Sequence, residues 1–180
     1  MSELAGWTLG TGAVSGLGGL WLLLAPRAAK GFLERFPRNG WLGWMLSAGA
    51  YAGAAVALWQ APPEWMAGWR DLLWVVAPVA WILTALFLDE LLAPRALGGL
   101  LLLAASPILD AARFHPSSAR LIMVVLAYGG VGLGLWWVAS PWGFRQTLRP
   151  LLAEPWRLRI AGLLLFTLGM ALIGLGRSVF

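Results

Sequence analysis

The residues of this chain that could do chemistry are few, and the ionisable ones lie beside long apolar blocks. One apolar block ends beside Asp89, Glu90 and Arg95, and the next ends beside Asp110 and Arg113. Acids and arginines this close in sequence are expected to form ion pairs at a membrane boundary. The alternative is a proton or cation site reached from the boundary, because ionisable groups inside a membrane usually serve a function. Asp89 is the better candidate for such a site if its helix continues through Leu92.

Other reactive groups are scarcer still. His115 is the only histidine and cysteine is absent, so a haem held by two histidines of this chain is excluded, as is disulfide or thiolate chemistry. His115 lies in a mostly polar run where a loop is expected, and Ser117 or Ser118 is placed to cap the next helix. The sequence predicts no catalytic residue, no metal site and no cofactor other than ordered lipid.

Composition indicates the environment of the chain. Only 12% of its 180 residues are charged, against 60% that are hydrophobic. A soluble domain carries roughly 25% charged residues, so this chain has too few to cover a water-facing surface. Its apolar blocks approach the length of about 20 residues that a spanning helix needs. The sequence therefore predicts an all-α integral membrane protein, with about six transmembrane helices in a single polytopic domain.

The expected helices cover residues 7–25, 41–59, 72–90, 95–110, 120–139 and 157–176. The fourth is the shortest, so it is expected to thin the bilayer or to be re-entrant. Trp81 lies well inside the third block, where it should pack between helices and donate its indole N–H to a neighbour.

Basic residues predict an orientation. If the N-terminus is outside, the cytoplasmic connectors hold Arg27, Lys30, Arg35, Arg38, Arg95, Arg145, Arg149, Arg157 and Arg159, and the outer side holds Arg70, Arg113, Arg120 and Arg177. The positive-inside rule then favours N-out and C-out, in a bacterial inner membrane. The net charge of +5 is assigned to contact with lipid headgroups, with no nucleic acid as partner.

One sequence motif recurs. The residues Leu23–Ala28 (LLAPRA) return unchanged as Leu91–Ala96, and a looser third copy runs from Val138 to Pro141. This pattern predicts three helical hairpins related by a parallel repeat. The alternative is convergence, in which proline and arginine mark a helix end at the membrane surface each time.

Glycines recur on single faces of four of the expected helices. They are Gly12, Gly16 and Gly19 in the first, Gly49 and Gly53 in the second, Gly130 and Gly134 in the fifth, and Gly162, Gly169 and Gly176 in the sixth. Such stripes let helix backbones approach closely, so helix packing is the expectation. The alternative, a pore lined by small residues, would also need polar groups.

These features favour a non-catalytic integral membrane subunit, which acts as a scaffold or accessory component of a larger complex. Its expected partners are membrane lipids and other membrane subunits or a second copy of itself. The alternative is a channel or transporter for a small solute. Its polar lining would come from Thr11, Ser15, Ser47, Tyr51, Thr84, Tyr128 and Thr167.

Overall fold

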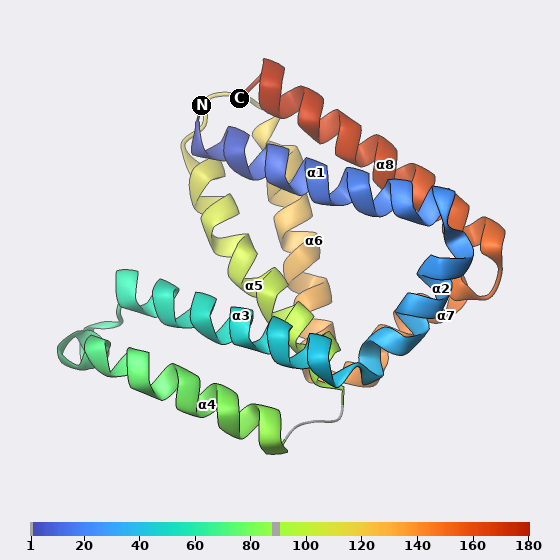
Figure 1. Ribbon diagram of the computed structural model, residues 1–180. Helices are drawn as coiled ribbons and strands as arrows, with labels where there is room; N and C mark the ends of the chain where they lie inside the picture. The colour runs from blue at the N-terminus through green and yellow to red at the C-terminus, as the bar shows by residue number, and fades with distance from the viewer. Residues whose placement is uncertain (1, 88–90) are drawn as a thin grey trace. The chain divides into compact units, whose positions relative to one another are not determined.

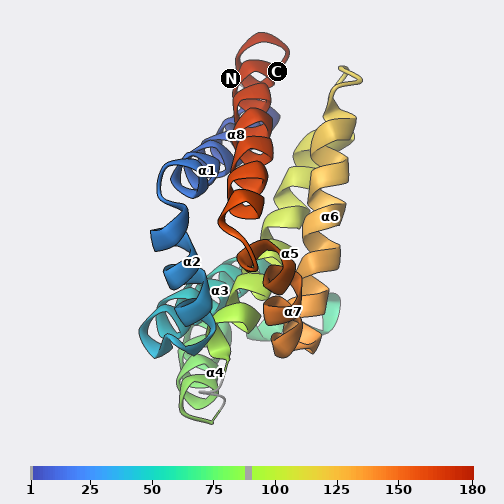
Figure 2. The same ribbon diagram turned by 90° about the vertical axis from the view of Figure 1, so that its right-hand side faces the viewer.

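The computed structural model describes residues 2–87 and 91–180, and this part of the chain is helical with no strand (Figures 1 and 2). The elements in order are α1 (Glu3–Leu24), α2 (Pro26–Arg35), η1 (Phe36–Arg38), α3 (Gly40–Gln60), η2 (Glu64–Leu72), α4 (Leu73–Phe87), α5 (Leu92–Arg113), α6 (Arg120–Ala139), α7 (Pro141–Leu152) and α8 (Pro155–Ser178). The predicted all-α class is confirmed.

Six helical segments of the described chain are long and apolar enough to cross a membrane: Glu3–Leu24, Gly40–Gln60, Gly68–Phe87, Leu92–Arg113, Arg120–Ala139 and Pro155–Ser178. The predicted six spans are thereby confirmed. The protein is accordingly treated as an integral membrane protein.

The fourth span is longer than its sequence suggested. Helix α5 has 22 residues, which corresponds to about 33 Å at the usual rise per residue and matches a hydrocarbon core of about 30 Å. Pro94 occupies its first turn, where backbone N–H groups have no acceptor within the helix, so this proline removes no hydrogen bond. Pro107 lies inside the helix without ending it. The helix therefore has the length of a complete span.

The chain divides into two compact units, which are described separately. Unit 1 comprises Met1–Glu34, Ala105–Gly130 and Arg145–Phe180, and unit 2 comprises Arg35–Ala104 and Val131–Phe144. Helices α5, α6 and α7 contribute one part to each unit.

Unit 1 is built on the antiparallel pair α1 and α8, which run side by side (Figure 1). A Cβ atom placed on Gly12 would lie 2.9 Å from the carbonyl oxygen of Gly169, and one on Gly162 would lie 2.9 Å from that of Gly19. At the far end of the pair, the Ser2 hydroxyl donates to the carbonyl of Phe180 at 2.9 Å. The two backbones thus touch along most of their length.

Unit 2 combines the pair α3 and α4 with the first part of α5 and the last part of α6. A Cβ on Gly98 would lie 2.7 Å from the carbonyl oxygen of Gly134, so α5 and α6 also meet through backbone. An aromatic cluster adds to this contact: the ring of Phe144 lies 5.0 Å from that of Trp137 and 5.3 Å from that of Phe36.

The three copies of the repeated motif share one local feature, which is that each proline opens a helix. Pro26 is the first residue of α2, Pro94 is the third of α5, and Pro141 is the first of α7. The first and third copies lead into short helices, whereas the second leads directly into a spanning helix. The prolines, expected at helix ends, therefore lie in the first turn of the helix that follows.

We expect Gly169→Ala to destabilise the protein by about 1–3 kcal/mol, the usual range for an overpacked interface. Its new Cβ would lie 2.7 Å from the Gly12 carbonyl oxygen and would also clash with the Gly16 backbone. Gly174→Ala, on the same helix, is the control because a Cβ there meets nothing within 4 Å. Unfolding in detergent by titration with SDS measures both variants, and equal stability would contradict the close α1–α8 contact.

Candidate functional site

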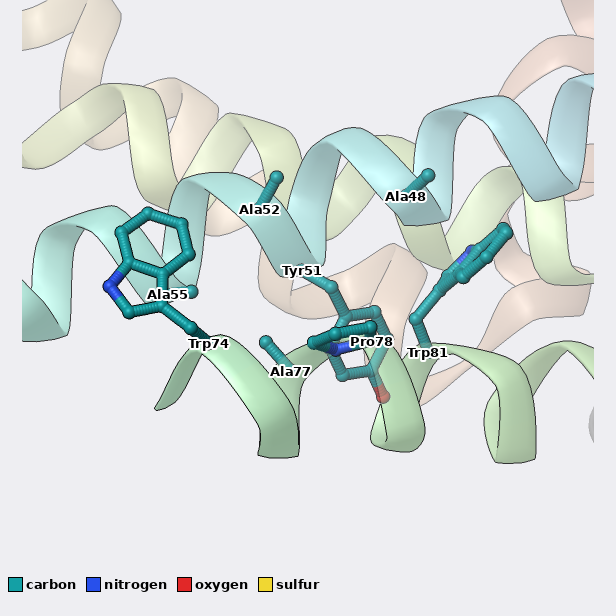
Figure 3. Close-up of a pocket in the computed structure, with 8 residues that line it drawn as sticks. All are labelled: Ala48, Tyr51, Ala52, Ala55, Trp74, Ala77, Pro78 and Trp81. Atoms are coloured by element: carbon teal, nitrogen blue, oxygen red, sulfur yellow. The ribbon is translucent and has the colours of Figure 1, made fainter. Parts of the chain in front are cut away.

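An apolar cavity of about 240 Å³ lies between α3 and α4 in unit 2 (Figure 3). Helix α3 contributes Ala48, Tyr51, Ala52 and Ala55, and α4 contributes Trp74, Ala77, Pro78 and Trp81. Figure 3 shows Trp74 and Trp81 at the two ends of the lining, with Tyr51, Ala77 and Pro78 between them.

Helical periodicity explains how both lining sets form. Ala48, Ala52 and Ala55 are spaced i, i+4 and i+7, as are Trp74, Pro78 and Trp81, so each set follows one helix face. Pro78 has no N–H to donate to the carbonyl of Trp74, its usual acceptor four residues earlier, so α4 has one helical hydrogen bond less beside the cavity. Alanine side chains on the opposite helix leave space at this point.

Hydrogen bonds between side chains hold the two helices beside the cavity. The hydroxyl groups of Tyr51 and Thr84 lie 2.6 Å apart. The indole N–H of Trp81 donates to the Ser47 hydroxyl at 3.0 Å and to the Trp44 carbonyl at 3.3 Å, which confirms the prediction for Trp81. Buried polar groups destabilise a protein unless they are hydrogen-bonded. These hydrogen bonds satisfy the polar side chains between the two helices, and no charged residue takes part in them.

The predicted glycine positions divide by environment. Gly12, Gly16, Gly19, Gly162 and Gly169 all lie at the α1–α8 contact of unit 1. In unit 2, Gly49 and Gly53 face side chains of α5, with contacts of 3.9 Å to Leu100 and 3.4 Å to Leu103. Gly134 packs on Gly98, whereas a Cβ on Gly130 would meet nothing within 4 Å. Most glycine stripes therefore pack against another helix of their own unit. In the stripe of the fifth helix, Gly134 packs in this way and Gly130 does not.

Of the first group of ionisable candidates, the structure describes only Arg95. Asp89 and Glu90 lie outside the described residues. Arg95 is in the first turn of α5, and its Nε atom is buried without a hydrogen-bond partner in the described part of the chain.

The other predicted pair, Asp110 with Arg113, does not form an ion pair in residues 91–180. Asp110 lines an open hollow of about 710 Å³ in unit 1, together with Glu3 and Trp7 of α1. The Arg113 guanidinium lies 5.6 Å from the centre of the Phe114 ring instead. At this helix end the arginine is engaged by an aromatic ring rather than by the carboxylate.

The loop around His115 contains a cap that sequence reasoning missed. Arg120 donates from Nη1 to the carbonyls of Arg113 and His115, each at 2.9 Å, and so satisfies the C-terminal end of α5. The Ser117 hydroxyl accepts from the Ala119 N–H at 3.2 Å just before α6. Arg120 was counted only as an outer-side charge, and its position seven residues after the helix end gave little sign of this role.

Three of the seven hydroxyl groups considered for a solute path donate to carbonyls of their own helices. Thr11 donates to the Trp7 carbonyl at 2.8 Å, Ser47 to the Trp44 carbonyl at 3.0 Å, and Thr167 to the Leu164 carbonyl at 3.0 Å. This is the common behaviour of such side chains within helices. It leaves the apolar cavity of Figure 3 as the better-defined site.

No protein-family model, curated protein or solved structure matches the chain. In the described ranges 2–87 and 91–180, no group of three His, Cys, Asp or Glu side chains could hold a metal ion. Function must therefore be inferred from the helices and the cavity themselves.

We expect Tyr51→Phe to weaken the α3–α4 pair by about 1 kcal/mol, the scale of hydrogen bonds between membrane helices. Thr84→Val should cost the same, and the double variant should cost little more than either single one, because both remove one interaction. Tyr128→Phe is the control, since this tyrosine is 62% exposed. Additive losses in SDS-titrated unfolding would show that the two hydroxyls do not interact.

Proposed function

We propose that the protein is a non-catalytic integral membrane subunit, in which the groove between α3 and α4 receives a transmembrane helix of another membrane protein. The observation that carries this proposal is the exposure of the span Gly68–Phe87, which contains α4. Within the best 18-residue apolar window of this span only 6% is buried, whereas the other five spans have between 17% and 33% buried. Helix α4 therefore presents an apolar surface that a partner can cover.

The shape of the groove supports a helix as the occupant. Helices in lipid associate through close packing, and small residues at the contact allow a neighbouring backbone to come near. Ala52 on α3 and Ala77 on α4 are small residues of this kind. Trp74 and Trp81 stand at the two ends of the cavity and would contact the sides of an inserted helix (Figure 3).

The surface beside the groove is apolar, as the surface of a partner helix in lipid would be. Val75, Val79, Ile82 and Leu86 of α4 are between 47% and 64% exposed. Lipid can cover such side chains equally well, so they add area without selectivity. The small alanine side chains of the groove supply the shape that distinguishes a partner helix from lipid chains.

The proposal includes an orientation, with both termini on the outer side of a bacterial inner membrane. The antiparallel course of α1 and α8 supports placing the two termini on the same side. The basic helices α2 and α7 adjoin the opposite end of that pair, where the positive-inside rule would put the cytoplasm.

Filling the groove tests the proposed partner contact. We expect Ala52→Leu to reduce the amount of a co-purifying membrane protein at least tenfold in mild detergent, because the larger side chain occupies the space of the incoming helix. Ala57→Leu is the matched control: it makes the same change at another exposed position of α3, outside the cavity lining. Equal recovery of the same partner with both variants would contradict the proposal.

Cysteine labelling tests the orientation, because the chain has no native cysteine. With an impermeant thiol reagent on intact spheroplasts, we expect labelling of Ser118→Cys and Ser178→Cys. Thr147→Cys on α7 should react only after the membrane is permeabilised. Labelling of Thr147→Cys in intact spheroplasts would reverse the proposed orientation.

A further inference from the structure

We propose that the corner between α7 and α8, residues 145–159, binds the phosphate groups of anionic phospholipids. This inference goes beyond the proposed helix-binding role and uses residues of unit 1 only. The corner contains four arginines, at positions 145, 149, 157 and 159, and one acid, Glu154. Its net charge is therefore +3, from four positive and one negative side chain.

Three of these arginines are available to an anion. Arg145 and Arg149 are one turn apart on α7, and Arg159 lies in the first turn and a half of α8. All three are exposed, and none has a hydrogen bond or ion pair among the described residues. Like charges this close on a helix repel one another, so a bound anion would relieve that repulsion.

The single acid of the corner is already engaged by its neighbours. Glu154 lies 3.9 Å from the guanidinium of Arg157 and accepts a hydrogen bond from the indole N–H of Trp156. Arg157 also donates to the carbonyl of Pro150 at 3.2 Å and stacks 5.4 Å from the centre of the Trp156 ring. These contacts hold Arg157 in place and make Glu154 a poor competitor for the other three guanidinium groups.

The position of the corner identifies a lipid as the source of the anion. Arg145 and Arg149 precede the apolar span Pro155–Ser178, and Arg159 lies near its start, so these arginines lie where a membrane span meets the headgroups. Trp156 is 53% exposed at the same level, and tryptophan rings settle at the headgroup layer. Along α7, Leu148, Leu151 and Leu152 are half-buried while Arg145 and Arg149 face outward, as in helices that lie in the interface.

Most neighbouring charges in unit 1 are also positive. Because α1 and α8 are antiparallel, α2 starts at the end where α8 begins, and it adds Arg27, which is exposed. Lys30 of α2 is partly neutralised by Glu34 at 3.9 Å. The two acids Glu3 and Asp110 line a hollow beside the beginning of α1, at the opposite end of the pair.

The test is a titration of the purified full-length protein, in neutral detergent, with phosphatidylglycerol or with phosphatidylcholine of the same acyl chains. Native mass spectrometry measures the bound lipid. We expect tighter binding of phosphatidylglycerol, and Arg145→Gln with Arg149→Gln should weaken it about 30-fold, at about fivefold for each charge. Arg145→Lys with Arg149→Lys should retain most of the binding, which separates charge from packing.

The matched control is Arg113→Gln with Arg177→Gln, which removes the same charge from exposed arginines near the other ends of the spans. It should leave the phosphatidylglycerol affinity within twofold, as should the groove variant Ala52→Leu. Equal affinity for the two lipids, or an equal loss in the control pair, would overturn the proposal. Unchanged thermal unfolding of each variant in detergent shows that the comparison concerns folded protein.

Discussion

The constraint on which this structure depends is that helices in lipid gain little from burying apolar surface against one another. Lipid chains are as apolar as leucine, so association needs dense packing or paired polar groups. The α1–α8 pair takes the first course: glycines at 12 and 19 on one helix meet glycines at 169 and 162 on the other. That contact joins segments from the two ends of the chain and places α2 and α7 at one end of unit 1.

The α3–α4 pair of unit 2 takes the second course. Its glycines at 49 and 53 face α5, so the side toward α4 carries alanine, serine and tyrosine instead. The Tyr51–Thr84 and Trp81–Ser47 hydrogen bonds then hold the pair through side chains. Because the linking side chains are larger than hydrogen, the backbones remain apart and a cavity is left between the hydrogen-bonded positions.

Much of the fold could be predicted because lipid restricts the choices. A continuous apolar run has to satisfy the hydrogen bonds of its own backbone, which makes it a helix, and α6 begins and ends at the predicted residues 120 and 139.

The glycine positions could also be read from the sequence, but which stripe packs against which could not. A heptad such as Gly162, Gly169 and Gly176 marks a packing face without naming its partner, since every small-residue stripe can accept every other. The length of α5 was underestimated because its predicted ends were placed at the charged residues 95 and 110, whereas the helix continues beyond both.

The cavity was beyond sequence reasoning for a related reason. Ala48, Ala52 and Ala55 look like an ordinary packing stripe, and whether such a stripe is filled depends on the residues opposite. Here Pro78 and Ala77 face them, and neither can reach across the space that Tyr51 and Trp81 keep open. A contact made of glycines brings the two backbones together and leaves no space between them for a third helix. The groove proposed to receive a partner helix therefore depends on the absence of glycine on the α4-facing side of α3, which leaves this pair with the looser backbone contact.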